Sequence, residues 1–159
     1  LNNYFKLYAM NCIKSTLTAF AIVASLTACS DDDDDDRIVL TDANVPTEIT
    51  NYVKSNFPQN AILKTVKETN GKSFSYEVLL AENFQLEFDE AFNIVEIDGV
   101  TALPASVIPD AILDYVAEHY ATYFITDWEL ELDHQQVELN NKVELEFRMD
   151  GTFIRIDND

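Results

Sequence analysis

The chain has 159 residues, of which 47% are hydrophobic, so it can bury the core of one domain or of two small ones. Its 3 glycines and 4 prolines are too few for a low-complexity protein. The formal net charge is −19 at pH 7, and such a surface repels DNA, RNA and anionic lipid headgroups. Composition therefore argues against nucleic-acid binding, whereas a basic partner or a divalent cation is compatible with it.

The N-terminal segment has the features of an export signal. Lys6 and Lys14 supply positive charge, and an apolar run covers residues 17–28. A run of this length is too short to cross a bilayer as a stable helix, which takes about 20 apolar residues. The segment therefore predicts a signal peptide at residues 1–28 that is removed from the mature protein.

The apolar run ends in Leu26-Thr27-Ala28-Cys29, which resembles the lipobox of bacterial lipoproteins. The resemblance implies cleavage before the cysteine and a diacylglycerol on the Cys29 thiol. The protein would then be lipid-anchored to the outer membrane of a Gram-negative cell envelope, on the periplasmic side or at the cell surface. An incidental cysteine at the end of an ordinary signal peptide is the alternative. Lipidation would leave no disulfide, because Cys12 is lost with the signal peptide.

Six aspartates, Asp31–Asp36, follow Ser30. Adjacent like charges repel one another and cannot pack, so residues 29–37 are predicted to form an extended, solvated tether that begins at the lipidated cysteine. A metal site would need ligands held in converging positions, which a flexible tract does not supply. A serine followed by acidic residues also resembles the export signal of surface lipoproteins in some Gram-negative bacteria.

The remainder of the chain contains an internal repeat. Residues 45–62 align with residues 108–125 at an offset of 63, and residues 86–98 align with residues 145–157 at an offset of 59. The smaller second offset means that one hairpin is shorter in the second copy. Two blocks that align in the same order indicate a duplicated unit.

Each repeat is predicted to be a helix followed by four antiparallel strands, with the first repeat at 38–99 and the second at 100–159. Apolar residues at helical spacing follow Pro46 and Pro109, since proline suits the first turn of a helix, and Pro58 ends the first helix. The period then changes to two, as in strands with one buried face. The strands are expected near 62–69, 72–80, 83–89 and 94–98, and again near 126–133, 137–139, 142–149 and 152–157.

The alternation gives the sheet an apolar face, which should take the helices, and an acidic face. The apolar face should contain Phe74, Tyr76, Val78, Leu86, Phe88, Val143, Leu145 and Phe147. The opposite face should contain Glu77, Glu87, Glu144 and Glu146. The hairpin turns are expected at Asn70-Gly71, Asn140-Asn141 and Asp150-Gly151. The predicted fold class is α+β, a tandem repeat of helix plus four-stranded meander with about eight strands and two helices on one face.

The stretch "LPASVIPDAILDYVAEHY" leading to "VELEFRMDGTFIRID", with its earlier copy, resembles the PepSY-like domains of bacterial envelope lipoproteins, which share the architecture of β-lactamase-inhibitor-like proteins. The helix prolines, Tyr52, Tyr115 and the Leu-Glu-Phe motifs at 86–88 and 145–147 carry the resemblance. The first repeat departs from it at Ala91-Phe92, where the family usually has an Asp-Gly turn. The resemblance implies a non-catalytic domain that binds a partner protein through its sheet face, for example an extracytoplasmic peptidase or another enzyme.

The residues themselves offer little for catalysis. No serine or cysteine nucleophile has a placed base, and His119 and His134 fit a helix end and a strand turn better than a ligand set. Glu87 and Glu146 occupy equivalent repeat positions and are the best carboxylate pair. A catalytic pair needs a cleft and a separation of about 5 to 9.5 Å, so a solvated face is favoured over catalysis or Ca²⁺ binding. No catalytic residue, metal site or cofactor is predicted.

Phe92, Tyr123 and Phe153 are candidates for exposure on the acidic sheet, where an aromatic side chain would suit a protein-binding hot spot. Core packing is the alternative for each of them. With Glu87 and Glu146 they form the set of candidate binding residues. We expect a protein-binding domain, and the alternative is a small-ligand or divalent-cation binder that uses the acidic face.

Overall fold

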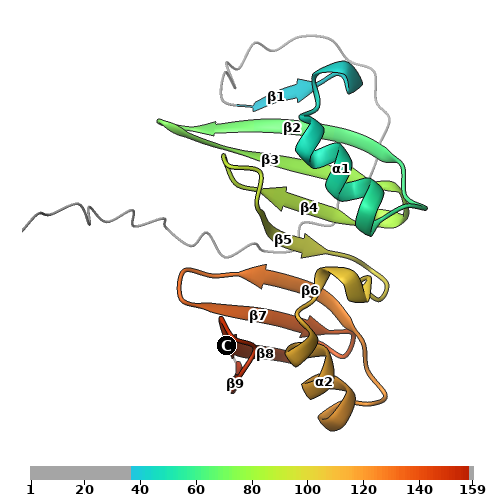
Figure 1. Cartoon of the computed structure of the whole chain (residues 1–159), viewed down its shortest axis with the longest axis vertical. Coiled ribbons are helices and arrows are strands. Elements are labelled where there is room, and N and C mark those ends of the chain that lie inside the picture. The colour runs from blue at the N-terminus through green and yellow to red at the C-terminus, as the bar shows by residue number, and fades with distance from the viewer. Residues whose placement is uncertain (1–36, 158–159) are drawn as a thin grey trace, which may run out of the picture. The chain divides into compact units, whose positions relative to one another are not determined.

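The computed structural model describes residues 37–157, so the predicted signal peptide, Cys29 and the aspartate run lie outside the described residues. The elements in chain order are β1 (Arg37–Leu40), α1 (Thr47–Asn56), β2 (Ile62–Asn70), β3 (Ser73–Leu80), β4 (Gln85–Phe88), β5 (Ile94–Asp98), α2 (Asp110–His119), β6 (Ile125–Leu130), β7 (His134–Leu139), β8 (Glu144–Arg148) and β9 (Phe153–Asp157). The nine strands of this range form one antiparallel sheet in which each strand pairs with the next in sequence (Figure 1). No helix within it is long and apolar enough to span a membrane.

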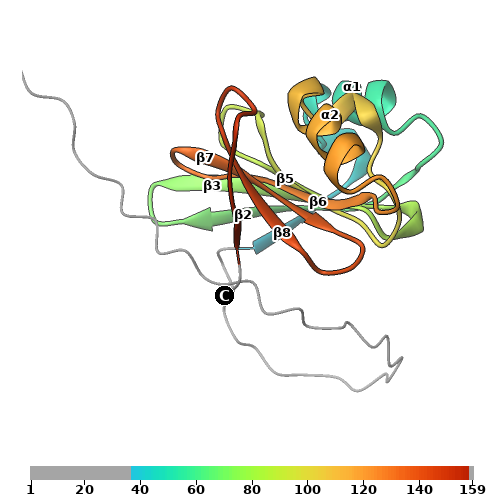
Figure 2. The ribbon, with the colours of Figure 1, turned by 90° about the horizontal axis from the view of Figure 1, so that it is seen from below.

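Both helices lie on the same face of the sheet, and no element of residues 37–157 covers the other face, which we call the open face (Figure 2). In Figure 1, α1 lies over the strands that follow it and α2 lies over β6 to β8. Period-two alternation explains this arrangement, because most of the strands have one apolar face, which must be buried. Each fully buried aliphatic or aromatic side chain contributes about 1.5–3 kcal/mol to stability. The core between helices and sheet includes Ile49, Val53, Phe57, Ile112, Val116, Tyr76, Val78, Leu86, Phe88, Val137, Leu139, Leu145 and Phe147.

The structure confirms the α+β class and a helix followed by four strands in each half of the described chain. The sheet has nine strands rather than about eight, because Arg37–Leu40 forms the edge strand β1. This strand pairs with β2 from Arg37 opposite Glu68 to Leu40 opposite Thr65. Its four residues are too few for a period-two pattern, and Ile38 and Val39 are 52% and 61% exposed. Pairing with β2, rather than burial, therefore defines β1, and Arg37 belongs to the sheet instead of the tether.

The helix boundaries agree with the prolines, with small differences. Pro46 and Pro109 are the N-cap residues, directly before the first residue of each helix. Their backbone is extended and not helical, so neither proline lies in the first helical turn. The first helix ends before Pro58, as expected. The second helix begins at Asp110, and the segment Ala105–Val107 forms a separate turn of 3₁₀ helix before it.

The turn between β4 and β5 keeps the geometry of the turn between β8 and β9 although the sequences differ. Gly151 has φ +80°, and Phe92, its repeat equivalent, has φ +64°. In the first repeat the Asp89 side chain accepts hydrogen bonds from the backbone N–H groups of Ala91 and Asn93, at 2.9 and 2.8 Å. This side-chain bonding holds the turn that glycine would otherwise favour, so the departure at Ala91-Phe92 does not remove the hairpin.

Gly151→Ala should destabilise the fold by about 2 kcal/mol or more. A Cβ at this position would lie 2.6 Å from the Cβ of Ala111 at the start of α2, and the left-handed backbone adds strain. Chemical denaturation would measure the loss. Gly71→Ala is the matched control, because Gly71 has φ +64° but no atom within 4 Å of the new Cβ. Its expected cost is about 1 kcal/mol, and equal losses in the two variants would contradict the packing argument.

Candidate functional site

The open face of the sheet is crossed by a row of glutamates. Glu77 on β3 is opposite Glu87 on β4, Glu87 is opposite Glu96 on β5, and Glu96 is opposite Glu129 on β6. Residues directly opposite each other on antiparallel strands point to the same face, with Cβ atoms about 4.5–5.5 Å apart. These four residues therefore form a continuous line of carboxylates, which we call the glutamate row.

A second acidic row runs beside the first. Asp98 on β5 is opposite Asp127 on β6, which is opposite Glu138 on β7, which is in turn opposite Glu144 on β8. The two rows lie two residues apart along β5 and β6, so they share the same face. The centre of the open face thus presents two adjacent lines of acidic side chains.

Arginines neutralise the two ends of the open face. Arg37 on β1 donates to the carboxylates of Glu77 and Glu68, at 2.6 and 3.1 Å. Arg155 on β9 donates to Glu146 on β8, at 2.6 Å. Both arginines lie on edge strands, because β1 and β9 are the first and last strands of the sheet. The edge strands therefore neutralise the two ends of the open face, and Lys142, outside the edge strands, pairs with Glu138 of the second row at 2.6 Å.

The middle of the glutamate row has no such partner. Within residues 37–157, no ion pair reaches Glu87, Glu96 or Glu129. Burial, followed by the charges of Glu129 and Glu87, raises the pKa of Glu96 to about 7. Burial is also the main cause of the raised pKa values of Glu87 and Glu129. In the second row, burial, and then the charges of Glu96 and Asp98, raise the pKa of Asp127 to about 8. Like charges directly opposite each other destabilise a sheet, so these rows lower stability at neutral pH.

The carboxylates lie in lines rather than in a cluster. In the described part of the chain, no group of three or more His, Cys, Asp or Glu side chains is placed to hold a metal ion. A Ca²⁺ ion takes six to eight oxygen ligands that converge on one point. Strand spacing separates the side chains of the rows, so the open face is an extended electrostatic surface.

Glu87 and Glu146, the carboxylate pair selected from the sequence, both lie on the open face. They are four strands apart, on β4 and β8, which places them about 19 Å from each other at the usual strand spacing. This distance is beyond the range of a catalytic carboxylate pair. Their surroundings also differ, because the side chain of Glu146 is 9% exposed and paired with Arg155, whereas Glu87 has no ion pair in the described range.

The three aromatic candidates lie outside the acidic rows. Phe92 packs beside Tyr76 of the core, with ring centroids 5.5 Å apart. Phe153 stacks on Tyr115 of α2 at 4.5 Å. Tyr123 is 42% exposed, in the segment between α2 and β6. A role for any of them in binding stays a prediction, and Phe92 and Phe153 face the helices instead of the open surface.

Sequence reasoning placed Glu77 and Glu87 on the open face correctly, but it missed the row to which they belong. Glu96 and Glu129 complete that row, and their pairing joins the last strand of the first repeat to the first strand after α2. Each residue occupies the polar phase of its strand, so the face could be predicted. The alternation of apolar and polar residues does not indicate which residues of β5 and β6 are opposite each other.

A single antiparallel sheet with both helices on one face is the architecture that the sequence resemblance implies. The chain belongs to the PepSY-like family, because a family model described as "Putative beta-lactamase-inhibitor-like, PepSY-like" matches residues 34–96 and again residues 74–155. The two matches support a tandem repeat. No match was found among functionally curated proteins.

Three solved structures share the fold across nearly their whole length. A protein from Bacteroides thetaiotaomicron described as a "putative calcium-regulated periplasmic protein" is 29% identical, with a TM-score of 0.73 and coverage of 78% of this chain and 98% of its own. A "putative periplasmic protein" from Bacteroides vulgatus is 31% identical, with a TM-score of 0.72 and coverage of 79% and 99%. A second protein from Bacteroides vulgatus, described as a "putative periplasmic protein of unknown function", is 26% identical, with a TM-score of 0.72 and coverage of 77% and 99%. These neighbours agree with an envelope location.

The free energy of unfolding should fall as the pH rises from about 5 to about 8. Raised carboxyl pKa values mean that the folded chain binds protons more tightly than the unfolded chain in this window, so deprotonation favours unfolding. Glu96→Gln should stabilise the protein by about 1 kcal/mol at pH 8, because it removes two opposed like-charge pairs. Urea denaturation at several pH values would measure both effects.

Glu118→Gln, on the exposed surface of α2, is the control for this experiment, and its effect should stay within about 0.5 kcal/mol. A stability that does not change between about pH 5 and pH 8, or equal effects of the two substitutions, would show that the glutamate row carries no electrostatic strain.

Proposed function

We propose that this protein is a non-catalytic binding domain of the cell envelope that engages a positively charged partner protein through the open face of its sheet. The observation that carries this proposal is the glutamate row, three of whose members have no ion pair within the described residues. A fold gains nothing by aligning like charges, so a function outside the fold is the simplest reason to keep them.

The chemistry of the open face favours a basic partner. A lysine or arginine placed between two carboxylates of the row would neutralise charges that the fold leaves opposed, and the association would offset their mutual repulsion. The summed negative potential of the face would also speed encounter with such a partner, in a manner that salt suppresses. An apolar hot spot is less suitable here, because the three aromatic candidates lie away from the rows.

The comparisons support a non-catalytic role. The family is described as inhibitor-like, and inhibitors act by contact with a partner rather than by chemistry. An extracytoplasmic peptidase or another secreted enzyme would be a partner of this kind. Duplication of the helix-plus-four-strand unit would suit the same role, because it doubles the width of the surface that a partner can contact.

The proposal includes a lipid anchor on Cys29 and attachment to the outer membrane. Cys29→Ala should release the full-length protein into the soluble fraction of the cell, because the thiol that would carry the lipid is absent. Fractionation followed by immunoblotting would measure the change. Membrane association that survives the substitution would rule out anchoring through this cysteine.

A second candidate function is binding of a divalent cation by the acidic rows. The description of the Bacteroides thetaiotaomicron neighbour as calcium-regulated favours it, together with the density of carboxylates on the open face. The linear arrangement of the rows weighs against it, since no converging ligand group occurs among residues 37–157. We therefore rank it below partner binding.

Affinity capture from envelope extracts would test the proposal, with the fragment Arg37–Asp159 as bait. The fragment is expected to fold alone, because the solved neighbours consist almost wholly of the matching part. A stoichiometric partner should be retained, and the triple variant Glu87→Gln, Glu96→Gln and Glu129→Gln should reduce its binding at least tenfold. Binding should also weaken as the salt concentration rises.

The matched control makes the same charge change on the helices, with Glu48→Gln, Asp114→Asn and Glu118→Gln, and it should bind as the unchanged fragment does. Equal retention by the two triple variants would show that the open face is not the interface. Melting curves with added CaCl₂ separate the second candidate, since a cation that binds only the folded state would raise the melting temperature of the unchanged fragment but not that of the glutamate-row variant.

A further inference from the structure

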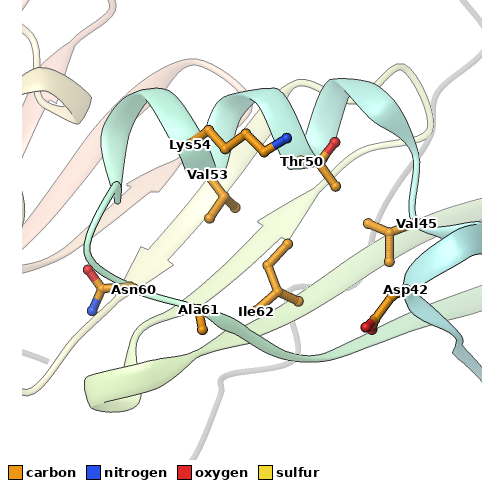
Figure 3. Close-up of a pocket in the computed structure, with 8 residues that line it drawn as sticks. All are labelled: Asp42, Val45, Thr50, Val53, Lys54, Asn60, Ala61 and Ile62. Atoms are coloured by element: carbon orange, nitrogen blue, oxygen red, sulfur yellow. The ribbon is translucent and has the colours of Figure 1, made fainter.

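The two repeats carry a cavity at the same place, between the helix and the start of the strand that follows it. The cavity of the first repeat has a volume of about 280 Å³, and the cavity of the second has a volume of about 270 Å³. Each of the eight residues that line the first, which Figure 3 shows, has its counterpart 63 positions later in the lining of the second. Duplication has therefore produced two equivalent cavities.

The floors of the two cavities are alike. Val53 of α1 and Ile62 of β2 line the first, and Val116 of α2 and Ile125 of β6 take the same positions in the second. All four side chains are aliphatic and buried or half-buried. Either floor could therefore accept a small aliphatic group.

The rims differ in chemistry. The first cavity has four polar residues where the second has small or apolar ones and a tyrosine. The pairs, first cavity before second, are Asp42 and Ala105, Thr50 and Leu113, Lys54 and Ala117, and Asn60 and Tyr123. Repeat equivalence thus makes the second cavity an internal control for the first, with the same frame and no charged residue among those that line it.

The two charges at the first rim are available to a ligand. Neither Asp42 nor Lys54 has an ion pair or a side-chain hydrogen bond within residues 37–157, and both side chains are exposed. Figure 3 shows Lys54 and Thr50 on α1 along one side of the cavity, with Asp42 on the segment across from them. The hydroxyl of Thr50 and the amide of Asn60 already donate to backbone carbonyls, at 2.9 and 3.0 Å, so their oxygens are left to accept.

We propose that the cavity of the first repeat binds a small zwitterion with an aliphatic side chain, the chemistry of a free aliphatic α-amino acid. Its ammonium group would meet the Asp42 carboxylate, its carboxylate would meet the Lys54 ammonium, and its side chain would rest on Val53 and Ile62. The opposite charges at the rim and the aliphatic floor complement the three parts of this ligand. The equivalent cavity of the second repeat does not bind it.

Titration of the ¹⁵N-labelled Arg37–Asp159 fragment with L-leucine, followed by two-dimensional NMR, tests the proposal. Saturable shifts should appear at backbone amides around Thr50, Lys54 and Ile62. The dissociation constant should be on the order of 1 mM, because a ligand of this size held by exposed charge contacts binds weakly. N-acetyl-L-leucine lacks the ammonium group and L-leucinamide lacks the carboxylate. Each should bind at least fivefold more weakly than L-leucine.

Asp42→Ala and Lys54→Ala give the first cavity the residues that the second already has. Each should weaken L-leucine binding at least fivefold without a change in the dispersion of the NMR spectrum. Lys72→Ala, at an exposed lysine in the β2–β3 turn, is the control and should bind as the unchanged fragment does.

Three results would overturn the proposal. The first is no saturable shift with L-leucine up to about 50 mM, some fiftyfold above the expected dissociation constant. The others are unchanged binding after both rim substitutions and shifts that map to the cavity beside Ala117 and Tyr123.

Discussion

In an antiparallel sheet the register between strands decides which side chains share a face, because residues opposite one another must point to the same side. Here nine strands pair in sequence order, and both helices occupy one face. The apolar phase of the central strands is therefore directed to the helices, and their polar phase is collected on the other side. Because Glu87 is opposite both Glu77 and Glu96, the register alone concentrates negative charge at the centre of the open face.

The elements could be predicted from periodicity, but the rows could not, because register depends on irregularities that alternation does not reveal. A bulge in the pairing of β4 and β5 brings Glu96 opposite Glu87 and Ile94 opposite Phe88. Another in the pairing of β6 and β7 leaves Thr126 buried between Ile125 and Asp127. The edge strand β1 was missed for a related reason, since its backbone pairing and not its own side chains makes it a strand.

Equivalence between repeats proved to be a guide to position and not to environment. Glu87 and Glu146 occupy the same position in their units. Arg155 on an edge strand neutralises Glu146, whereas no ion pair within residues 37–157 reaches Glu87. The cavities beneath α1 and α2 show the same divergence, with one frame and two chemistries. Sequence comparison between the two repeats identifies equivalent residues. The charge and polarity around each of them depend on the neighbouring strands and helices.

The edge strand β1 also takes the position of a strand from a preceding repeat. Leu40 is opposite Thr65, and Ile97 of β5 is opposite Trp128, the residue 63 positions after Thr65. The strand β1 therefore fills the place that the last strand of a preceding unit would fill, and it acts as a four-residue cap on a linear array. At the other end, β9 corresponds to β5, but no strand of the described range pairs with its outer edge. In the described range, β9 is therefore a five-residue edge strand that carries Arg155 and Asp157 at the positions of Glu96 and Asp98 of β5.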